Sequence, residues 1–145
     1  MVNDIIMSIE LFTDAGANGQ TKKGVGAYLI VKDKSRDIKV LHELLKTVEL
    51  TETNSTSAEL RTFLHAIKEI EATDVTVYTD CSALIRLGPV HKKRIEEKFD
   101  GREMHQLYKQ CYEVLQRINC TFIKVKGHKT TRERNNVDQV FRLVD

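Results

Sequence analysis

Five short runs of apolar and β-branched residues, separated by polar turns, predict five β-strands in this chain. The runs span residues 8–13, 25–32, 38–50, 75–79 and 121–125. Asn18-Gly19 and the polar residues 33–37 are short turn sequences of the kind that joins antiparallel strands. The first three runs therefore predict a meander, although residues 41–45 in the third run also fit a helix.

Apolar positions three and four residues apart predict helices among the later strands. In residues 57–72 this stripe consists of Leu60, Phe63, Leu64, Ile67 and Ile70. Similar patterns predict helices over residues 81–87, 103–118 and 134–144, and the charged residues 91–100 fit a further helical piece. The order of elements predicts an α/β fold, formed as a single domain over residues 1–145. It is a mixed five-stranded sheet, with a three-strand antiparallel meander and two parallel strands, flanked by helices.

The composition is that of an ordinary soluble protein. A chain of 145 residues is long enough for one domain with one core. Of these residues, 41% are hydrophobic and 30% are charged. There is no apolar run long enough to span a membrane and no secretory signal, so we expect no membrane association. The three cysteines, Cys81, Cys111 and Cys120, lack the spacing of a metal site and predict reduced thiols. We therefore expect a cytoplasmic protein, and we expect it to be a monomer.

Positive charge is concentrated in two blocks, although the net charge is only +2. The first block runs from His91 to Arg94. The second block consists of Lys124, Lys126, His128, Lys129, Arg132 and Arg134. Such blocks can bind the phosphates of nucleic acids, although either block taken alone is more simply explained as a solvated charged face.

Two of the predicted strands end in the same dipeptide, Thr-Asp. Residues 11–14 read Leu-Phe-Thr-Asp, and residues 75–80 read Val-Thr-Val-Tyr-Thr-Asp. If these strands are parallel neighbours, Asp14 and Asp80 meet at the carboxyl end of the sheet. Open α/β sheets place their functional sites at that end.

Glu59 and Asp138 complete a set of four acids, each of which also has a structural explanation. Glu59 closes a capping-box sequence that begins at Thr56, Asp80 could cap a helix, Asp14 could be a turn residue and Asp138 could be a solvated helix residue. Brought together, however, four carboxylates would raise one another's pKa unless cations neutralised them. Such oxygen ligands suit Mg²⁺ or Mn²⁺. Two ions roughly 4 Å apart can activate a water and stabilise the leaving oxygen in phosphodiester cleavage.

Four segments, taken in order, resemble type 1 ribonuclease H over essentially the whole chain. They are Phe12-Thr13-Asp14, Ala58-Glu59-Leu60, Tyr78-Thr79-Asp80-Cys81-Ser82, and Val125-Lys126-Gly127-His128 with Asp138 ten residues later. The resemblance implies the ribonuclease H-like fold and a metal-dependent hydrolase. This enzyme would be an endonuclease that cuts the RNA strand of RNA/DNA hybrids by two-metal-ion catalysis, leaving 3′-hydroxyl and 5′-phosphate ends. The implied cofactor is Mg²⁺, two ions per site, for which Mn²⁺ can substitute.

The resemblance also implies a role for each acid. Asp14 and Asp80 would hold the metal ions most directly, with Asp14 bridging both. Glu59 would complete one site near the 2′-hydroxyl of the RNA, and Asp138 would ligate the ion that positions the attacking water. His128 would assist proton transfer or product release, unless it is a loop histidine with no task.

Substrate contacts are expected next to the acids. Contacts to RNA 2′-hydroxyls are expected from Ala15, Gly16, Asn18, Asn54, Ser55 and Thr56. The other expected contacts are Ser82, Lys126, Lys129 and Arg134. The basic residues among them would bind phosphates without reading the sequence.

Some of these contact positions differ from the usual pattern of the family. Asp14 is followed by Ala15-Gly16 rather than Gly-Ser, and Ser55 and Thr56 stand where many members have an Asn pair. Arg134 stands six residues after the histidine, where an Asn is expected. The chain also contains no Trp, which some members use near a basic protrusion. These differences leave the acid set intact and concern the grip on the hybrid.

Two other functions are compatible with the same residues. A metal-dependent exonuclease with this sheet usually places a His or Tyr four or five residues before the last acid. The ten-residue spacing from His128 to Asp138 argues against that function. The main alternative is a non-catalytic ribonuclease H-like module that binds RNA/DNA hybrids or structured RNA. The altered contact positions allow this module, while the complete acid set argues against it.

Overall fold

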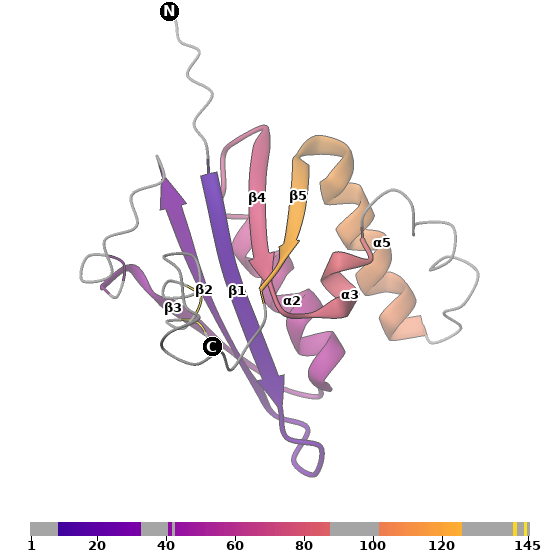
Figure 1. The fold of residues 1–145 in the computed structure, drawn as a ribbon. Coiled ribbons are helices and arrows are strands. Elements are labelled where there is room, and N and C mark those ends of the chain that lie inside the picture. Colours follow the sequence, from indigo (N-terminus) through magenta and orange to yellow (C-terminus); the bar gives the residue numbers. More distant parts are fainter. Residues whose placement is uncertain are drawn as a thin grey trace, which may run out of the picture.

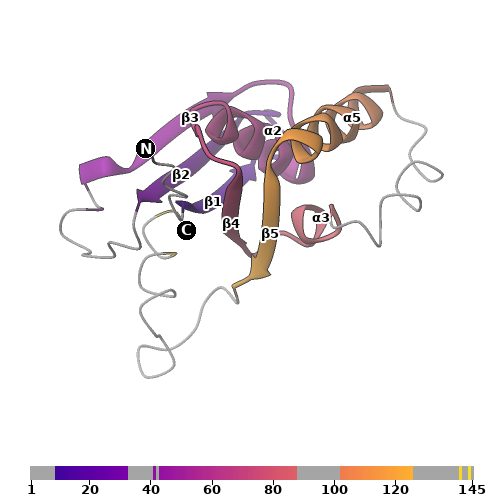
Figure 2. The same ribbon diagram turned by 90° about the horizontal axis from the view of Figure 1, so that it is seen from above.

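The computed structural model describes residues 9–32, 41, 43–87, 102–125, 141 and 144. These residues form a five-stranded sheet with strand order β3-β2-β1-β4-β5, and α2 and α5 cover one of its faces (Figure 1; Figure 2). The predicted fold is confirmed, since β1, β2 and β3 are antiparallel neighbours and β4 and β5 run parallel to β1. Within the described ranges, no helix is both long and apolar enough to cross a membrane.

β1 lies at the centre of the sheet. It pairs in antiparallel fashion with β2, which places Asp14 opposite Ala27, and in parallel fashion with β4, which places Phe12 opposite Tyr78. The carboxyl ends of β1 and β4 therefore point in the same direction (Figure 1). The strands are β1 (Ile9–Ala17), β2 (Gly24–Lys32), β3 (Lys46–Leu50), β4 (Asp74–Thr79) and β5 (Asn119–Lys124).

Two strands differ from their predicted bounds. β1 continues to Ala17, because its last four residues pair with the first four of β2. Asp14 therefore lies inside a strand, which contradicts its interpretation as a turn residue. β3 begins only at Lys46, whereas the hydrophobic pattern predicts a strand that starts eight residues earlier. Leu41 and Leu44 are helical, so the alternative interpretation of their segment is the correct one there.

The helices lie close to their predicted positions. They are α2 (Ser55–Ile67), α3 (Ser82–Ile85) and α5 (Arg102–Arg117). α2 ends before Ile70, the last residue of its predicted apolar stripe. Ile70 is still buried, but it lies in the turn that follows the helix. The charged residues 91–100 and residues 126–134, which carry all of the second basic block except Lys124, lie outside the described residues, as does most of the last predicted helix. Phe141 and Val144, which belong to that helix, are helical.

One face of the sheet packs closely against α2. Leu11, Val77 and Phe63 are completely buried there. Gly26 of β2 lies beneath the helix, and a Cβ atom at this position would be 1.9 Å from Thr62 Oγ1. The absence of a side chain at Gly26 therefore determines how closely α2 approaches the sheet.

The opposite face carries a second apolar cluster. Phe12 and Tyr78 stack with their ring centroids 4.6 Å apart, and they belong to one buried cluster with Phe141 and Val144. The Tyr78 hydroxyl donates a 3.0 Å hydrogen bond to Oε2 of the buried Glu10. These contacts join β1 to β4. Phe12 and Tyr78 each lie two residues before an acid, Asp14 and Asp80 respectively.

Candidate metal centre

Three acids meet at the carboxyl ends of β1 and β4. Asp14, Glu59 and Asp80 each contribute a carboxylate oxygen, and these oxygens lie within 4.8 Å of one another. Asp14 comes from β1, Asp80 directly follows β4, and Glu59 comes from α2. The parallel pairing of β1 and β4 brings the two aspartates together as the sequence predicts. Both aspartates are half-buried, while Glu59 is only 6% exposed.

Glu59 is oriented by a contact to β1 and not by its own helix. Its Oε1 accepts a 3.1 Å hydrogen bond from the backbone N–H of Ala15. The capping-box interpretation is therefore wrong. The N-cap is Asn54, whose Oδ1 accepts a 2.8 Å hydrogen bond from the N–H of Ser57.

Burial is the main influence on the charge of Glu59. The pKa of this carboxyl is raised from 4.5 to about 7, chiefly by burial and also by repulsion from Asp80. Hydrogen bonds with the Asp14 carboxyl and the Ala15 N–H oppose part of the rise in pKa. The second oxygen, Oε2, is buried and accepts no N–H or hydroxyl in the described part of the chain. A hydrogen bond between the Glu59 and Asp14 carboxyls requires a shared proton. Without a cation, the site therefore tends to retain that proton.

The donor set fits a divalent cation. Three clustered carboxylates supply the hard oxygen ligands that Mg²⁺ and Mn²⁺ prefer, and a cation can replace the proton that the Glu59 and Asp14 carboxyls otherwise share. Cys81 follows Asp80 directly, but burial raises the pKa of its thiol above the ordinary value. A neutral thiol is a poor ligand, so the oxygen atoms define the character of this centre.

Several predicted contact residues lie beside these acids in the chain and are exposed or half-buried. They are Ala15, Gly16, Asn18, Asn54, Ser55, Thr56 and Ser82. Other predicted site residues lie outside the described residues, and their roles stay predictions. They are Lys126, His128, Lys129, Arg134 and Asp138.

Two features of the site were not predicted from the sequence. The first is the hydrogen bond from the Ala15 N–H to Glu59, which joins residues far apart in the chain. The second is the close approach of Thr62 to Gly26, which determines the position of α2 and so of Glu59. The glycines at the start of β2 are a sequence signal for close packing, but they do not identify the partner.

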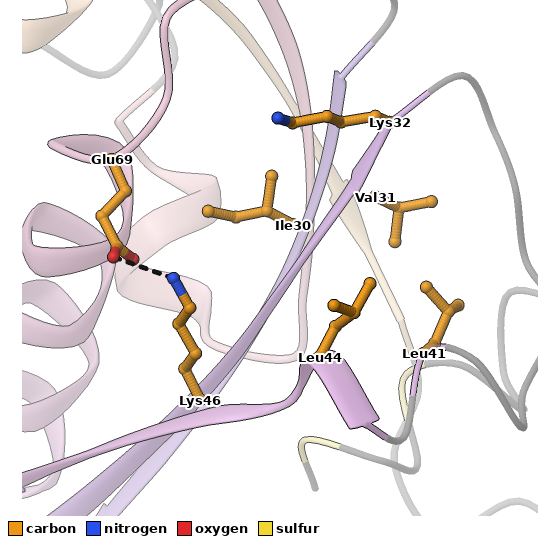
Figure 3. Close-up of a pocket in the computed structure, with 7 residues that line it drawn as sticks. All are labelled: Ile30, Val31, Lys32, Leu41, Leu44, Lys46 and Glu69. Carbon is orange, nitrogen blue, oxygen red and sulfur yellow. Dashed lines mark hydrogen bonds and ion pairs between the residues drawn. The ribbon is translucent and has the colours of Figure 1, made fainter.

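A separate pocket lies at the opposite end of β2 from the acids (Figure 3). Its volume is about 450 Å³, and one wall carries the ion pair between Lys46 Nζ and Glu69 Oε1, 3.0 Å apart. The Tyr28 hydroxyl donates a hydrogen bond to the other oxygen of Glu69. The lining residues are Ile30, Val31, Lys32, Leu41, Leu44, Lys46 and Glu69. Among the described residues that line it, Glu69 is the one carboxylate and is already paired, so these residues do not offer the ligands of a metal centre.

Comparison with known families identifies the chain. The family model for RNase H matches residues 7–143, which is nearly the whole sequence. The chain belongs to the RNase H family. No curated protein matches it significantly.

Solved RNase H structures share this fold at low sequence identity. LC11-RNase H1, solved in complex with an RNA/DNA hybrid, is 16% identical with a TM-score of 0.63, and the match covers 86% of this chain and 90% of that one. The N-terminal RNase H domain of rv2228c from Mycobacterium tuberculosis, solved as a fusion with maltose-binding protein, is 13% identical. Its TM-score is also 0.63, and the match covers 86% of each chain. At these identities the two likenesses show the fold of this RNase H.

Proposed function

We propose that this RNase H is a metal-dependent endonuclease that hydrolyses the RNA strand of RNA/DNA hybrids. The observation that carries the proposal is the meeting of Asp14, Glu59 and Asp80 within 4.8 Å at the carboxyl end of the sheet. Membership of the RNase H family supports the reaction class. The hybrid bound to LC11-RNase H1 supports the choice of substrate.

The energetic cost of Glu59 favours catalysis over a purely binding role. A carboxyl whose pKa burial raises to about 7 destabilises the metal-free fold near neutral pH. A module that only binds hybrids gains nothing from this cost, because clustered carboxylates also repel phosphates. In a metal-dependent nuclease, the same group is a ligand and the cation removes the penalty.

Asp14, Glu59 and Asp80 would hold two divalent ions, Mg²⁺ first and Mn²⁺ as a substitute. When bound, such ions activate a water and stabilise the leaving oxygen of a phosphodiester, which leaves 3′-hydroxyl and 5′-phosphate ends. The Ala15 N–H occupies Oε1 of Glu59, while Oε2 accepts no N–H or hydroxyl in the described part of the chain and is available as a ligand. The exposed residues next to the acids would select RNA through its 2′-hydroxyls.

Asp138 is the proposed fourth ligand, and its position in the sequence supports this role. It precedes Phe141 by three residues in the sequence, within the stretch whose hydrophobic pattern predicts a helix. Phe141 belongs to the same buried cluster as Phe12 and Tyr78, which each lie two residues before one of the clustered aspartates. His128 is proposed to assist proton transfer or product release.

The proposal is tested by cleavage of an end-labelled RNA/DNA hybrid with EDTA, Mg²⁺ or Mn²⁺. Single-stranded RNA, duplex RNA and duplex DNA serve as substrate controls. The Asp80→Asn variant should fold and lose cleavage. Asp74→Asn is the matched control, because Asp74 is exposed at the opposite end of the same strand.

The expected result is internal cutting confined to the RNA of the hybrid, present with metal and lost in Asp80→Asn. Near-normal metal-dependent turnover by Asp80→Asn would overturn the assignment of this acid. Tight binding of the hybrid without cleavage under either metal would favour the non-catalytic module instead.

A further inference from the structure

Two lysines lie on the turn between β1 and β2, at the end of the sheet that carries the acids. Asp14 is three residues before the end of β1, and the chain then turns through Lys22 and Lys23 into β2. Both lysines are exposed. In Figure 1 this turn projects beyond the carboxyl end of β4, on the side toward which β1 and β4 point. The backbone that carries the two lysines therefore lies at the same end of the sheet as the candidate metal centre.

The turn is held in one conformation by its own hydrogen bonds. Asn18 Oδ1 accepts from the N–H of Gln20 at 2.8 Å and from that of Thr21 at 3.1 Å. The Asn18 N–H donates to the Lys23 carbonyl, and the Lys22 N–H donates to the Asn18 carbonyl, both at 2.8 Å. Lys22 has a φ of 58°, in the left-handed region. With four hydrogen bonds in one turn, the backbone that carries the two lysines is well defined.

The turn is also attached to the segment that leads into α2. The N–H of Thr53 donates to the Lys22 carbonyl at 2.9 Å. A Cβ at Gly24 would be 2.8 Å from the Gly16 carbonyl oxygen and 2.9 Å from Thr53 Cγ2, so this glycine is required for the two segments to meet. Arg61 of α2 donates a 2.8 Å hydrogen bond to the Thr51 carbonyl, which also holds the segment that leads into α2.

The positive charge on this turn is not neutralised within the described ranges. Lys22 and Lys23 make no ion pair with any residue there, whereas Lys46 pairs with Glu69 at the pocket described above. Arg61 adds a third cation close by, against two exposed acids, Glu52 in the neighbouring segment and Glu49 opposite Val25 on β3. The surface is cationic, its backbone is hydrogen-bonded, and it lies at the same end of the sheet as the acids that the proposed function places on a phosphodiester.

We propose that Lys22 and Lys23 bind backbone phosphates of the RNA/DNA hybrid beside the cleavage site, as positioning residues. Lys23 lies opposite Asn18, four residues beyond Asp14, which is about 14 Å along the hairpin at the usual strand rise of about 3.4 Å per residue. One nucleotide strand also advances about 3.4 Å per residue. The lysines would therefore contact phosphates roughly four nucleotides from the scissile one. The identity of the substrate rests on the proposed function, while the cationic surface does not.

Phosphate contacts of this kind are recognised by their salt dependence. Each contact contributes a slope of about −0.9 to a plot of log K against log salt, so loss of two contacts should reduce the slope by about 2. Affinity at low salt should fall roughly tenfold or more. Because the lysines do not touch the reacting atoms, KM should rise while kcat stays nearly unchanged.

The variants separate charge from turn structure. Lys22→Asn with Lys23→Gln removes both charges, and Asn tolerates the left-handed conformation of position 22. Lys22→Arg with Lys23→Arg keeps both charges. The matched control is Lys68→Gln with Lys109→Gln, which removes the same net charge. Lys68 is exposed at the end of α2, and Lys109 is exposed on α5. Binding of a labelled hybrid is measured in EDTA at several NaCl concentrations, and cleavage is measured separately with Mg²⁺.

The inference is supported if the neutral turn variant loses affinity and salt slope while the arginine variant and the remote variant do not. It is overturned if the turn and remote variants lose the same amount, if neither loses any, or if the wild-type protein binds no hybrid. Because binding is measured without metal, the two proposals fail separately. A protein that binds through the turn but never cleaves overturns the proposed function alone, whereas normal cleavage with unchanged binding of the turn variant overturns this inference alone.

Discussion

Replacing Glu59 by glutamine should stabilise the metal-free protein at high pH. Glu59 is 6% exposed, and burial raises the pKa of its carboxyl from 4.5 to about 7. Ionised Glu59 is therefore less favourable in the folded protein than in the unfolded chain, where water surrounds it. In Glu59→Gln the side chain keeps its size and its acceptor for the Ala15 N–H, but it cannot ionise.

The size and sign of the effect follow from the two pKa values. A rise from 4.5 to about 7 corresponds to about 3 kcal/mol at 1.36 kcal/mol per unit. Well below pH 4.5 the carboxyl is neutral in both states, so it does not destabilise the fold. As the pH rises, the unfolded chain loses its proton first, and wild-type stability falls until the pH has passed about 7.

Urea unfolding in EDTA measures this difference. Near pH 8.5 we expect a midpoint for Glu59→Gln that is higher than the wild-type midpoint by roughly 1–2 M, and near pH 4.5 we expect nearly equal midpoints. Glu71→Gln is the matched control, since Glu71 is exposed and the same substitution there should change little at either pH. Equal stability of Glu59→Gln and wild type at pH 8.5, or a gap that does not depend on pH, would refute the reasoning.

Adding Mg²⁺ tests the link between the buried acid and the metal. A ligand that binds only the folded state stabilises it by mass action. Wild-type protein should therefore gain stability at pH 8.5, and Glu59→Gln should gain less because it has lost a charged ligand. The gap between them should narrow as Mg²⁺ increases. A gap that stays constant would mean that Glu59 does not contribute to metal binding.

Two further substitutions test how α2 is positioned. Gly26→Ala places a Cβ 1.9 Å from Thr62 Oγ1, so it should destabilise the protein by about 1–3 kcal/mol in thermal unfolding and reduce Mg²⁺-dependent cleavage. Adding Thr62→Ala should restore only part of the stability and of the cleavage, because the Thr62 Cβ would itself be 2.8 Å from the new Cβ. Asn54→Ala removes the N-cap and should lower stability by about 0.5–2 kcal/mol, whereas Asn54→Asp keeps the cap and should unfold at nearly the wild-type urea midpoint.

The pairing of the two aspartates could be predicted from the sequence because it depends on short-range patterns. The β-branched runs identify the strands, and the prediction holds because β1 and β4 are parallel neighbours, which is the condition it was made on. Asp14 and Asp80 then meet because each follows its strand's buried residues at the same end. The position of these acids in the chain and the direction of their strands are enough to locate the centre.

The orientation of Glu59 could not be predicted because its partner is remote. The local sequence from Thr56 to Glu59 satisfies a capping box, but the stronger cap, Asn54, starts the helix two residues earlier than the pattern predicts. With the cap provided by Asn54, the Glu59 carboxyl is available to the Ala15 N–H, which is 44 residues away in the chain. A contact at that distance leaves no local pattern. The start of β3 also depends on a remote partner. β3 begins at Lys46 because its pairing with β2 extends only as far as Tyr28, which lies opposite Lys46.

The candidate centre depends on two surfaces that meet at one end of the sheet. β1 and β4 place Asp14 and Asp80, and the stacked Phe12 and Tyr78 rings hold these strands together on the face away from α2. Glu59 comes from the other face, where its distance from the aspartates depends on how closely α2 packs on β2. A small change in helix position should therefore alter metal binding more than the stability of the sheet. The buried carboxyl makes this arrangement unfavourable near neutral pH until a cation binds, so metal affinity and folding stability are linked through the same side chain.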